Sequence, residues 1–416
     1  MNRRGVLAGL IASTAPPLCA RASTYDGSSN AADSAWLIDK IAARYAYLAD
    51  RRIDLARLND IYVPEARAVA SRDLFLSVLE RLLAELHDHH VGPNTNNDDS
   101  PQLIPTGADI WASMRMGRAI VDEVRPASAA AGAGVRAGDE IVSIAGVPAR
   151  RAVAALAPRT LSAPDPEADD YTLRVLLAGT HRTRRPFVVR GASGVERTIT
   201  LPPYRPEPPG PLLTVRQVGS DIACIRVQNS LGDRRLVRAF DDALASVRDV
   251  RSLILDLRNT PSGGDTDVAE PILGRFITRR RGYQRFLDPG PGKTLAKDSW
   301  VRAVDARGPF TAKMPLVVLV DRWTGSMGEG MTIGLDAMKR AQIVGARMAG
   351  LCGATQTIAL PHSGIGVSFP TQRLYHLDGT PREKWTPPVL VELAGAEGED
   401  PILARGLAVL GAPQIR

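Results

Sequence analysis

Residues 315–330 read PLVVLVDRWTGSMGEG, an apolar run that breaks at an aspartate and reaches Ser326 in the following turn. A second stretch of this kind, residues 253–265, reads LILDLRNTPSGGD and closes with Gly263 and Gly264. Each pattern predicts a buried strand that ends in a polar turn and leads into a helix. Ligand sites in open α/β sheets lie beyond the carboxyl ends of such strands, so we expect the two turns to meet there.

The sequence around these stretches alternates between strand and helix patterns, which predicts an α/β core with parallel strands. We place this core at residues 212–416. The expected strands are 222–227, 252–257 and 316–320, and the expected helices are 233–247, 266–276 and 327–339.

A serine at the start of a helix is most often a capping residue, but the same position suits a nucleophile. The N–H group of Met327 follows it at the positive end of the helix, where a tetrahedral oxyanion is stabilised. Glycines 263 and 264 let the backbone approach a ligand closely, as an oxyanion hole requires. The candidate nucleophile is therefore Ser326, and the candidate oxyanion donors are Gly263, Gly264 and Met327.

A small helical domain is predicted over residues 23–103, because apolar residues recur every three or four positions in 35–48 and 72–86. It ends in LHDHHV, residues 86–91. Three histidines and Asp88 cluster there, but adjacent positions on a helix point in different directions and do not converge on an ion. We expect no metal site, and a polar helix end is the alternative to a catalytic histidine.

A separate domain is predicted over residues 104–203. A strand at 118–124 leads through a short helix and a glycine turn into a second strand at 140–144. The proline-rich segment 204–211 cannot form a helix or a central strand, so it marks the border with the core.

The first 22 residues have the pattern of a secretory signal. Two arginines precede an apolar run at 5–20, and a small-x-small motif ends at Ala22, the expected cleavage site. The protein is therefore expected to be periplasmic or secreted. The apolar run is too short to span a bilayer, and no later run approaches about 18 apolar residues, so we expect no stable membrane insertion.

The amino-acid composition limits which other classes of protein the chain can belong to. The chain has 416 residues, of which 44% are hydrophobic and 23% charged, enough for two or three domains with cores. Its net charge of +7 does not indicate nucleic-acid binding, because the arginines are scattered and no basic helix is interleaved with aromatics. After signal cleavage Cys224 and Cys352 remain, and they leave a disulfide open in an oxidising compartment. Cys224 also fits as a small core residue.

Two resemblances join these features. The run VRPASAAAGAGVRAGDEIVSIAGVPA, residues 124–149, resembles a PDZ domain of the bacterial protease type. With DLRNTPSGG and with Ser326 three residues before Glu329, the chain resembles the C-terminal processing, or tail-specific, serine peptidases. The resemblance implies a multidomain α/β protein with a crotonase- or ClpP-like catalytic core. It implies a peptide or unfolded protein as substrate and no cofactor, with a PDZ-like domain that captures peptides by strand addition or serves as a structural lid.

The catalytic base that the resemblance implies differs from that of the best-known C-terminal processing peptidases. Those enzymes use a lysine at the position that Leu351 occupies here. A branch similar to the tricorn core protease instead takes a histidine from a segment such as LHDHHV, where His90 matches. In that branch a glutamate near the C-terminus helps to orient the histidine, and LDGTPREKWTPPVLVE, residues 377–392, puts Glu383 in the matching place. Imidazole has an ordinary pKa of about 6.5, which suits it to take and return one proton.

Two other functions stay open at this stage. The absent lysine is compatible with a peptide- or ligand-binding pseudoenzyme on the same fold, although Ser326, the glycine pair and His90 together speak against it. An esterase or another acyl hydrolase could use the same serine, but the chain lacks the G-x-S-x-G elbow.

Overall fold

The computed structural model describes residues 25–205, 210–219, 221–396 and 400–411. The predicted signal peptide lies outside these residues, as does the centre of the proline-rich segment. None of the helices within the described ranges combines the length and the apolar character that crossing a membrane needs.

A six-stranded sheet forms the centre of the core. Its order is β17-β14-β13-β10-β9-β8, with five parallel strands and an antiparallel β8 at one edge. The parallel core that the sequence predicted is therefore present. The strands are β8 (Leu213–Val218), β9 (Ile222–Val227), β10 (Ser252–Asp256), β13 (Leu316–Val320), β14 (Gln342–Gly345) and β17 (Val389–Leu390).

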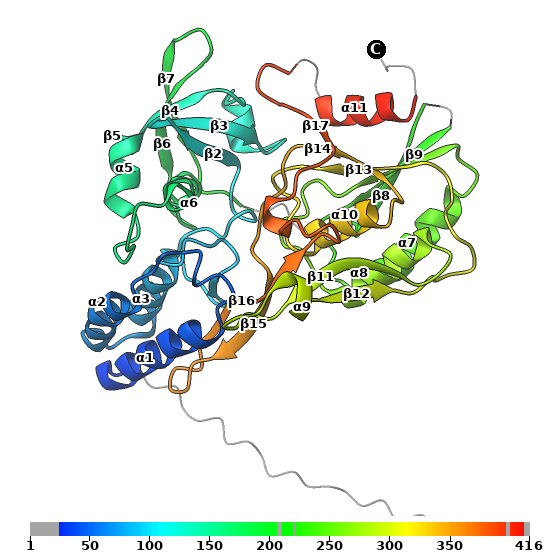
Figure 1. The fold of residues 1–416 in the computed structure, drawn as a ribbon. Helices are drawn as coiled ribbons and strands as arrows, with labels where there is room; N and C mark the ends of the chain where they lie inside the picture. The colour runs from blue at the N-terminus through cyan, green and yellow to red at the C-terminus, as the bar shows by residue number, and fades with distance from the viewer. Residues whose placement is uncertain (1–24, 206–209, 220, 397–399, 412–416) are drawn as a thin grey trace, which may run out of the picture.

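Helices cover both faces of this sheet, as Figure 1 shows. Successive side chains of β10 and β13 point to opposite faces of the sheet. In β10, Leu255 packs toward α10 and Ile254 packs toward α11. The helices on the first face are α7 (Arg235–Ser246), α8 (Thr266–Leu273) with the 3₁₀ turn η1 (Gly274–Phe276), and α10 (Met327–Ala337); α11 (Pro401–Val409) covers the second.

A second sheet, absent from the sequence prediction, extends the core toward the N-terminal helices. Its order is β1-β16-β11-β12, with β15 also paired to β16. Its elements are β1 (Gly92–Pro93), β11 (Arg281–Leu287), β12 (Trp300–Val304), β15 (Ala354–Ala359) and β16 (Gly366–Tyr375), with the short helix α9 (Leu295–Asp298) and the 3₁₀ turn η2 (Arg382–Lys384) beside them.

The helical region consists of α1 (Gly27–Arg44), α2 (Leu55–Arg67) and α3 (Arg72–Ala84). The sequence predicted α1 and α3, and α1 begins earlier than expected because the Asp26 side chain caps it. The prediction omitted α2, whose interior holds Pro64. The three helices share one apolar core with Val367 and Phe369 of β16, so this region rests on the second sheet.

The middle region, from β2 to β7, forms its own sheet in the order β2-β3-β4-β6-β7, with β5 paired to β4. Strands β3 and β4 have the bounds that the sequence predicted. The elements are β2 (Ile110–Arg115), β3 (Arg118–Val124), α4 (Ala129–Gly132), β4 (Glu140–Ile144), β5 (Val147–Pro148), α5 (Ala149–Leu156), α6 (Pro166–Ala178), β6 (Arg185–Arg190) and β7 (Glu196–Leu201).

An aromatic contact joins the middle region to the core. Trp111 and Trp323 meet edge to face at 6.4 Å between ring centroids, within a small apolar cluster that includes Leu351. The indole Nε1–H of Trp323 donates to the carbonyl oxygen of Ala108 over 2.8 Å. Since Trp323 lies in the turn that contains Ser326, this contact holds the middle region beside the candidate site.

The two cysteines in the described residues are buried free thiols, so the disulfide that the sequence left open is not formed. Cys224 lies in β9 among residues that face α11, as a small core residue. Cys352 packs with the helical region.

Candidate active site

The turns after β10 and β13 are joined by backbone and side-chain contacts. Thr260 and Thr324 form a parallel bridge. The Asp321 carboxylate accepts from the N–H of Asn259 over 3.2 Å, and the Thr324 hydroxyl donates to the Leu257 carbonyl over 3.1 Å. Parallel pairing of β10 with β13 brings both strand ends to one edge of the sheet, which explains why residues far apart in sequence meet.

Ser326 lies between the second turn and α10 in a strained backbone conformation. Its φ is 48° and its ψ is −107°, a region that residues with side chains rarely adopt. Helix α10 begins at the next residue. The backbone therefore turns sharply at Ser326 and places it at the positive end of a helix, where negative charge is stabilised.

Gly263 approaches Ser326 more closely than a larger residue could. A Cβ atom on Gly263 would lie 2.5 Å from the Cβ of Ser326 and 3.1 Å from both its Oγ and the backbone nitrogen of Met327. The φ of Gly263 is 61°, which also favours glycine. The structure thus brings together Ser326, Met327 and Gly263, three of the residues that the sequence singled out.

The N–H groups of these residues are engaged differently. The Gly263 N–H donates to the Thr260 carbonyl over 3.2 Å, whereas the N–H groups of Gly264 and Met327 have no acceptor in the described part of the chain. Gly264 is itself confined, because a Cβ there would lie 2.1 Å from the carbonyl oxygen of Leu231. Gly264 and Met327 therefore offer the available donors in this conformation.

A buried carboxylate holds the serine turn in place through hydrogen bonds. Glu329 is fully buried, and its two oxygens accept from the N–H groups of Ser326 (2.8 Å), Gly350 (2.9 Å) and Leu351 (3.2 Å). Burial raises the pKa of Glu329 to about 7, against the effect of Arg382 and these three donors. Glu329 thus links the serine turn to the segment around Leu351.

Arg382, which the sequence analysis did not single out, holds the same two segments together. Its guanidinium donates to the carbonyl oxygens of Ser326 (3.3 Å), Leu351 (2.9 Å) and Gly353 (2.9 Å). It is buried and forms no ion pair with any carboxylate in the described residues. A planar fork of N–H groups is suited to several carbonyl acceptors at once, which lysine cannot match.

His90 reaches this network through the residue next to Leu351. Its Nδ1 lies 2.6 Å from the carbonyl oxygen of Cys352, and its backbone N–H donates to Asp88 over 2.9 Å. A carbonyl can only accept, so Nδ1 carries the proton and Nε2 has the free electron pair in neutral imidazole. Burial first, and then Arg382, lowers the pKa of His90 below its ordinary value.

The other two histidines of this segment point elsewhere. His87 contacts the Asp165 carboxylate through Nε2 at 3.2 Å, and His89 stacks on Tyr171 with 4.5 Å between ring centroids. No group of three or more potential metal ligands occurs among the described residues.

Glu383 lies close to the segment that holds His90. The Tyr47 hydroxyl donates to its carboxylate over 3.3 Å, and its backbone carbonyl faces Gly350. Burial raises the pKa of this carboxyl group. In this structure the partner of His90 Nδ1 is the Cys352 carbonyl, so Glu383 neighbours the histidine segment without a hydrogen bond to the ring.

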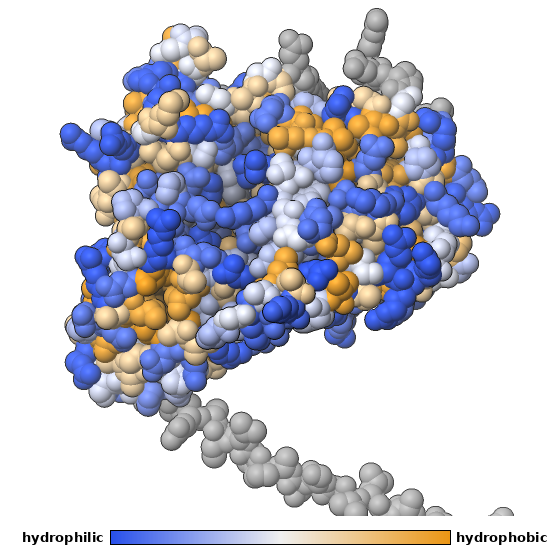
Figure 2. Space-filling model, viewed as in Figure 1, coloured by the Kyte–Doolittle hydropathy of each residue, from blue (hydrophilic) through white to orange (hydrophobic). Residues whose placement is uncertain are grey.

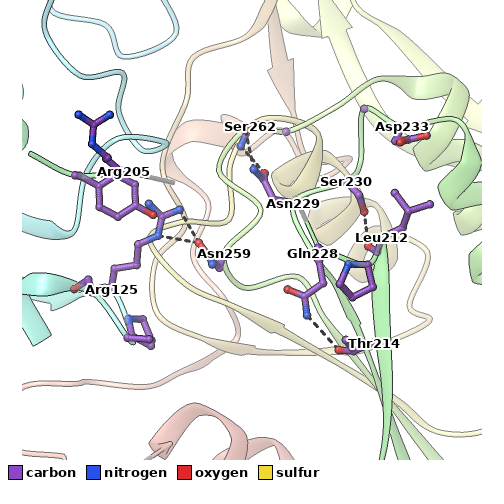
Figure 3. Close-up of a pocket in the computed structure, with 18 of the residues that line it drawn as sticks. Arg125, Arg205, Leu212, Thr214, Gln228, Asn229, Ser230, Asp233, Asn259 and Ser262 are labelled. Atoms are coloured by element: carbon purple, nitrogen blue, oxygen red, sulfur yellow. Dashed lines mark hydrogen bonds between the residues drawn. The ribbon is translucent and has the colours of Figure 1, made fainter. Parts of the chain in front are cut away.

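A cleft of about 1030 Å³ opens in front of the first turn, between the middle region and the core. Figure 3 shows Arg125 of the middle region reaching across to Asn259, where its Nε and Nη2 donate over 2.9 and 2.6 Å. On the opposite side Asn229 contacts Ser262, the residue before Gly263. The cleft therefore gives an extended ligand access to the glycine turn.

These features define a serine-type site on an α/β sheet, and the family comparison agrees. Residues 221–389 match the model of Peptidase family S41. The matched range contains both turns and Ser326, and it excludes His90. The matched part of the core is therefore similar to peptidase family S41, in agreement with the resemblance of its sequence signatures.

A curated relative covers part of the chain. A carboxy-terminal-processing protease from Bartonella bacilliformis is 28% identical over 203 residues, which make up 45% of this chain and 44% of that protein. The chain thus spans less than half the length of this relative in the alignment.

Solved structures show the same fold over most of the chain. The photosystem II D1 C-terminal processing protease has a TM-score of 0.57 at 20% identity, covering 88% of this chain and 93% of that one. Mature CPAF complexed with lactacystin has a TM-score of 0.58 at 15% identity, covering 92% and 97%.

We predict that Gly263→Ala will reduce labelling of Ser326 by a serine-directed phosphonate about 100-fold or more, because the new methyl group has no room beside Ser326. Labelling rates are measured by mass spectrometry of the intact protein. Gly292→Ala is the matched control: its φ of 74° is similarly positive, but the added Cβ meets no atom within 4 Å. Equal losses in both variants would show that backbone strain, and not the approach to Ser326, is responsible.

We also predict that Arg382→Lys will slow the labelling of Ser326 about 10-fold, because a single ammonium cannot hold three carbonyl groups in place. Arg340→Lys is the control, since Arg340 also donates to three backbone carbonyls, those of Phe276, Ala312 and Met314, away from the site. Thermal unfolding should report similar destabilisation in both variants. A normal labelling rate in Arg382→Lys would remove this residue from the positioning of Ser326.

Proposed function

We propose that the chain is an exported serine endopeptidase that cleaves unfolded proteins or peptide tails through an acyl-enzyme on Ser326. The observation that carries the proposal is the turn at Ser326, where the serine begins a helix in a strained conformation and packs against Gly263. A capping serine needs neither the strain nor the glycine contact, whereas a nucleophile needs both exposure and nearby backbone donors. The signal pattern of residues 1–22 supports export.

The proposed chemistry uses His90 as the base. Nε2 of neutral His90 takes the proton from Ser326 Oγ while Oγ bonds to the carbonyl carbon of the scissile peptide. The tetrahedral intermediate then collapses, the C–N bond breaks, and the proton passes from imidazolium to the leaving amine. Water attacks the acyl-enzyme by the same route, which releases the acid and restores both side chains.

The intermediate's negative oxygen is assigned to backbone donors. Met327 N–H lies at the positive end of α10, and Gly264 N–H lacks an internal acceptor. Gly263 N–H is the other candidate and would have to leave the Thr260 carbonyl to take part. The two glycines thus remain alternative partners of Met327.

Glu383 is proposed to support the base through the electrostatics of its surroundings. Its carboxylate lies beside Tyr47 and the Cys352 segment, where negative charge stabilises a transient imidazolium. The cleft beside Arg125 and Asn259 supports an extended peptide as substrate. It also supports the assignment of the middle region as a PDZ-like domain that borders the substrate path.

Two observations favour a second function, a non-catalytic peptide-binding protein. The Gly263 N–H is already bonded to Thr260, and no hydrogen bond joins Ser326 to His90 in this conformation. Such a protein would need neither a free Gly263 N–H nor a hydrogen bond between Ser326 and His90. Catalytic hydrogen bonds often tighten only when substrate binds, so this geometry is also compatible with an enzyme.

The test of the nucleophile is covalent labelling at pH 7. The wild-type protein should bind one serine-directed phosphonate at Ser326, identified by peptide mass spectrometry, and Ser326→Ala should bind none. His90→Ala should lose nearly all labelling, while Lys339→Ala and Lys384→Ala should retain most of it. An unlabelled but folded wild-type protein would favour the peptide-binding alternative.

The test of the base is the pH dependence of kcat/KM. His90 must be neutral to accept a proton, so activity should fall as the pH drops through its pKa. Because burial lowers that pKa, the acid limb should lie below the ordinary value of about 6.5. An inflection above about 8 would indicate a lysine base instead and would contradict the assignment.

A further inference from the structure

A second cavity, of about 440 Å³, lies behind the site at the junction of the three regions. Its walls come from β2 and α6 of the middle region, the LHDHHV segment of the helical region, and the core segments 347–352 and 382–385. Hydrophilic residues dominate the surface where these regions meet (Figure 2). Glu329 and Arg382 line one end of the cavity, so it adjoins the network that holds Ser326.

Trp111 lines the other end and carries a donor without a partner. Its side chain is 1% exposed, and its Nε1–H has no hydrogen-bond acceptor in the described part of the chain. The guanidinium groups of Arg174 and Arg322 lie over the same ring, at 4.8 and 5.4 Å from its centroid. A buried N–H that lacks an acceptor costs free energy, so an acceptor supplied by a ligand would be favoured.

Arg322 brings a positive charge to this end, and the opposite charges that act on it come from Asp122 and Glu123 of β3. Its side chain donates only to the Met348 carbonyl, over 3.2 Å, and forms no ion pair within the described residues. Burial, followed by the charge of Arg174, lowers its pKa to about 10. Arg347 adds a further like charge nearby and also lacks an ion pair in the described ranges.

The carboxylates of the cavity are committed to other partners. Asp170 binds Arg174 and the Met114 N–H, and Glu167 binds Arg51. At the far end Glu329 is occupied by three backbone N–H groups. Among the described residues, the side chains of Arg322 and Arg347 and the Nε1–H of Trp111 are therefore the donors at this end that no carboxylate occupies.

The same contacts close the free edge of β2. Asp170 accepts from the N–H of Met114 over 2.7 Å, and Arg174 donates to the carbonyl of Ala112 over 3.2 Å. These are the backbone groups that an added strand would pair with. In this conformation the side of the middle region that faces the cavity offers guanidinium groups, and not a strand edge, to a ligand.

We propose that the Trp111 end of this cavity binds a carboxylate group, held by Arg322, Arg347 and the Nε1–H of Trp111. A guanidinium fork matches the two oxygens of a carboxylate, and the indole N–H adds a third donor. The carboxylate can belong to the C-terminus of a peptide substrate, which rests on the proposed function, or to a free small acid. Such a ligand would neutralise Arg322 and connect the middle region to the core.

The test measures binding, so it does not depend on catalysis. The full chain with Ser326→Ala is titrated by calorimetry with an alanine-rich peptide that has a free C-terminal carboxylate, with the same peptide as an amide, and with sodium succinate. We expect the carboxylate peptide to bind at least about 10-fold more tightly than the amide, because a hydrogen bond to a charged group is lost in the amide. Arg322→Gln or Trp111→Phe in the same background should remove most of this difference.

Arg238→Gln is the matched control, since the Arg238 side chain is 91% exposed. It should leave all three titrations unchanged. Thermal unfolding checks that Arg322→Gln stays folded, because the substitution removes the contacts with the Met348 carbonyl and the Trp111 ring, and Trp111→Phe provides an independent variant. Binding of succinate with equal binding of both peptides would assign the site to a free acid. If neither succinate nor the peptide carboxylate binds in an Arg322-dependent manner, the proposal is overturned, whatever the labelling of Ser326 shows.

Discussion

The Glu329 carboxylate is the interaction on which the site depends. It is fully buried, and it accepts from the N–H groups of Ser326, Gly350 and Leu351, so it holds the serine turn and the segment around Leu351 together. A buried carboxylate without donors would be costly, but three N–H groups satisfy both oxygens. Because His90 is bonded to the next carbonyl of that segment, the position of the histidine relative to Ser326 also follows from this one carboxylate.

The parts of the fold with strong local signals could be predicted from the sequence. Strands β9, β13, β3 and β4 have the predicted bounds, because each is a short apolar run closed by turn residues. The second sheet was missed because its strands pair across long separations, as β11 does with β16. Their register depends on neighbours that a local pattern does not contain. Helix α2 was missed because Pro64 in its interior reads as a break, although the helix continues through it.

The residues of the candidate site likewise fall into those that local sequence patterns predict and those that depend on distant contacts. Ser326, Met327 and the glycine pair follow strand ends, so their meeting could be inferred from the rule for parallel sheets. Arg382 could not, because its function here rests on three carbonyl groups 29, 31 and 56 residues away in the chain. The two glycines of this turn also differ in their contacts. The N–H of Gly263 bonds to the Thr260 carbonyl, whereas Gly264 packs against Leu231.

The hydrogen-bond partner of His90 affects how basic the ring would be in its proposed role. A carboxylate at Nδ1 would raise the basicity of imidazole and stabilise its charged form, whereas the Cys352 carbonyl fixes the tautomer without adding a full charge. Burial and the unpaired Arg382 both favour the neutral ring. The neutral ring therefore keeps Nε2 able to accept a proton, but the lowered pKa makes His90 a weaker base than an ordinary histidine. In the proposed mechanism, Asp88 and Glu383 are the carboxylates near this segment that would stabilise the imidazolium once it forms.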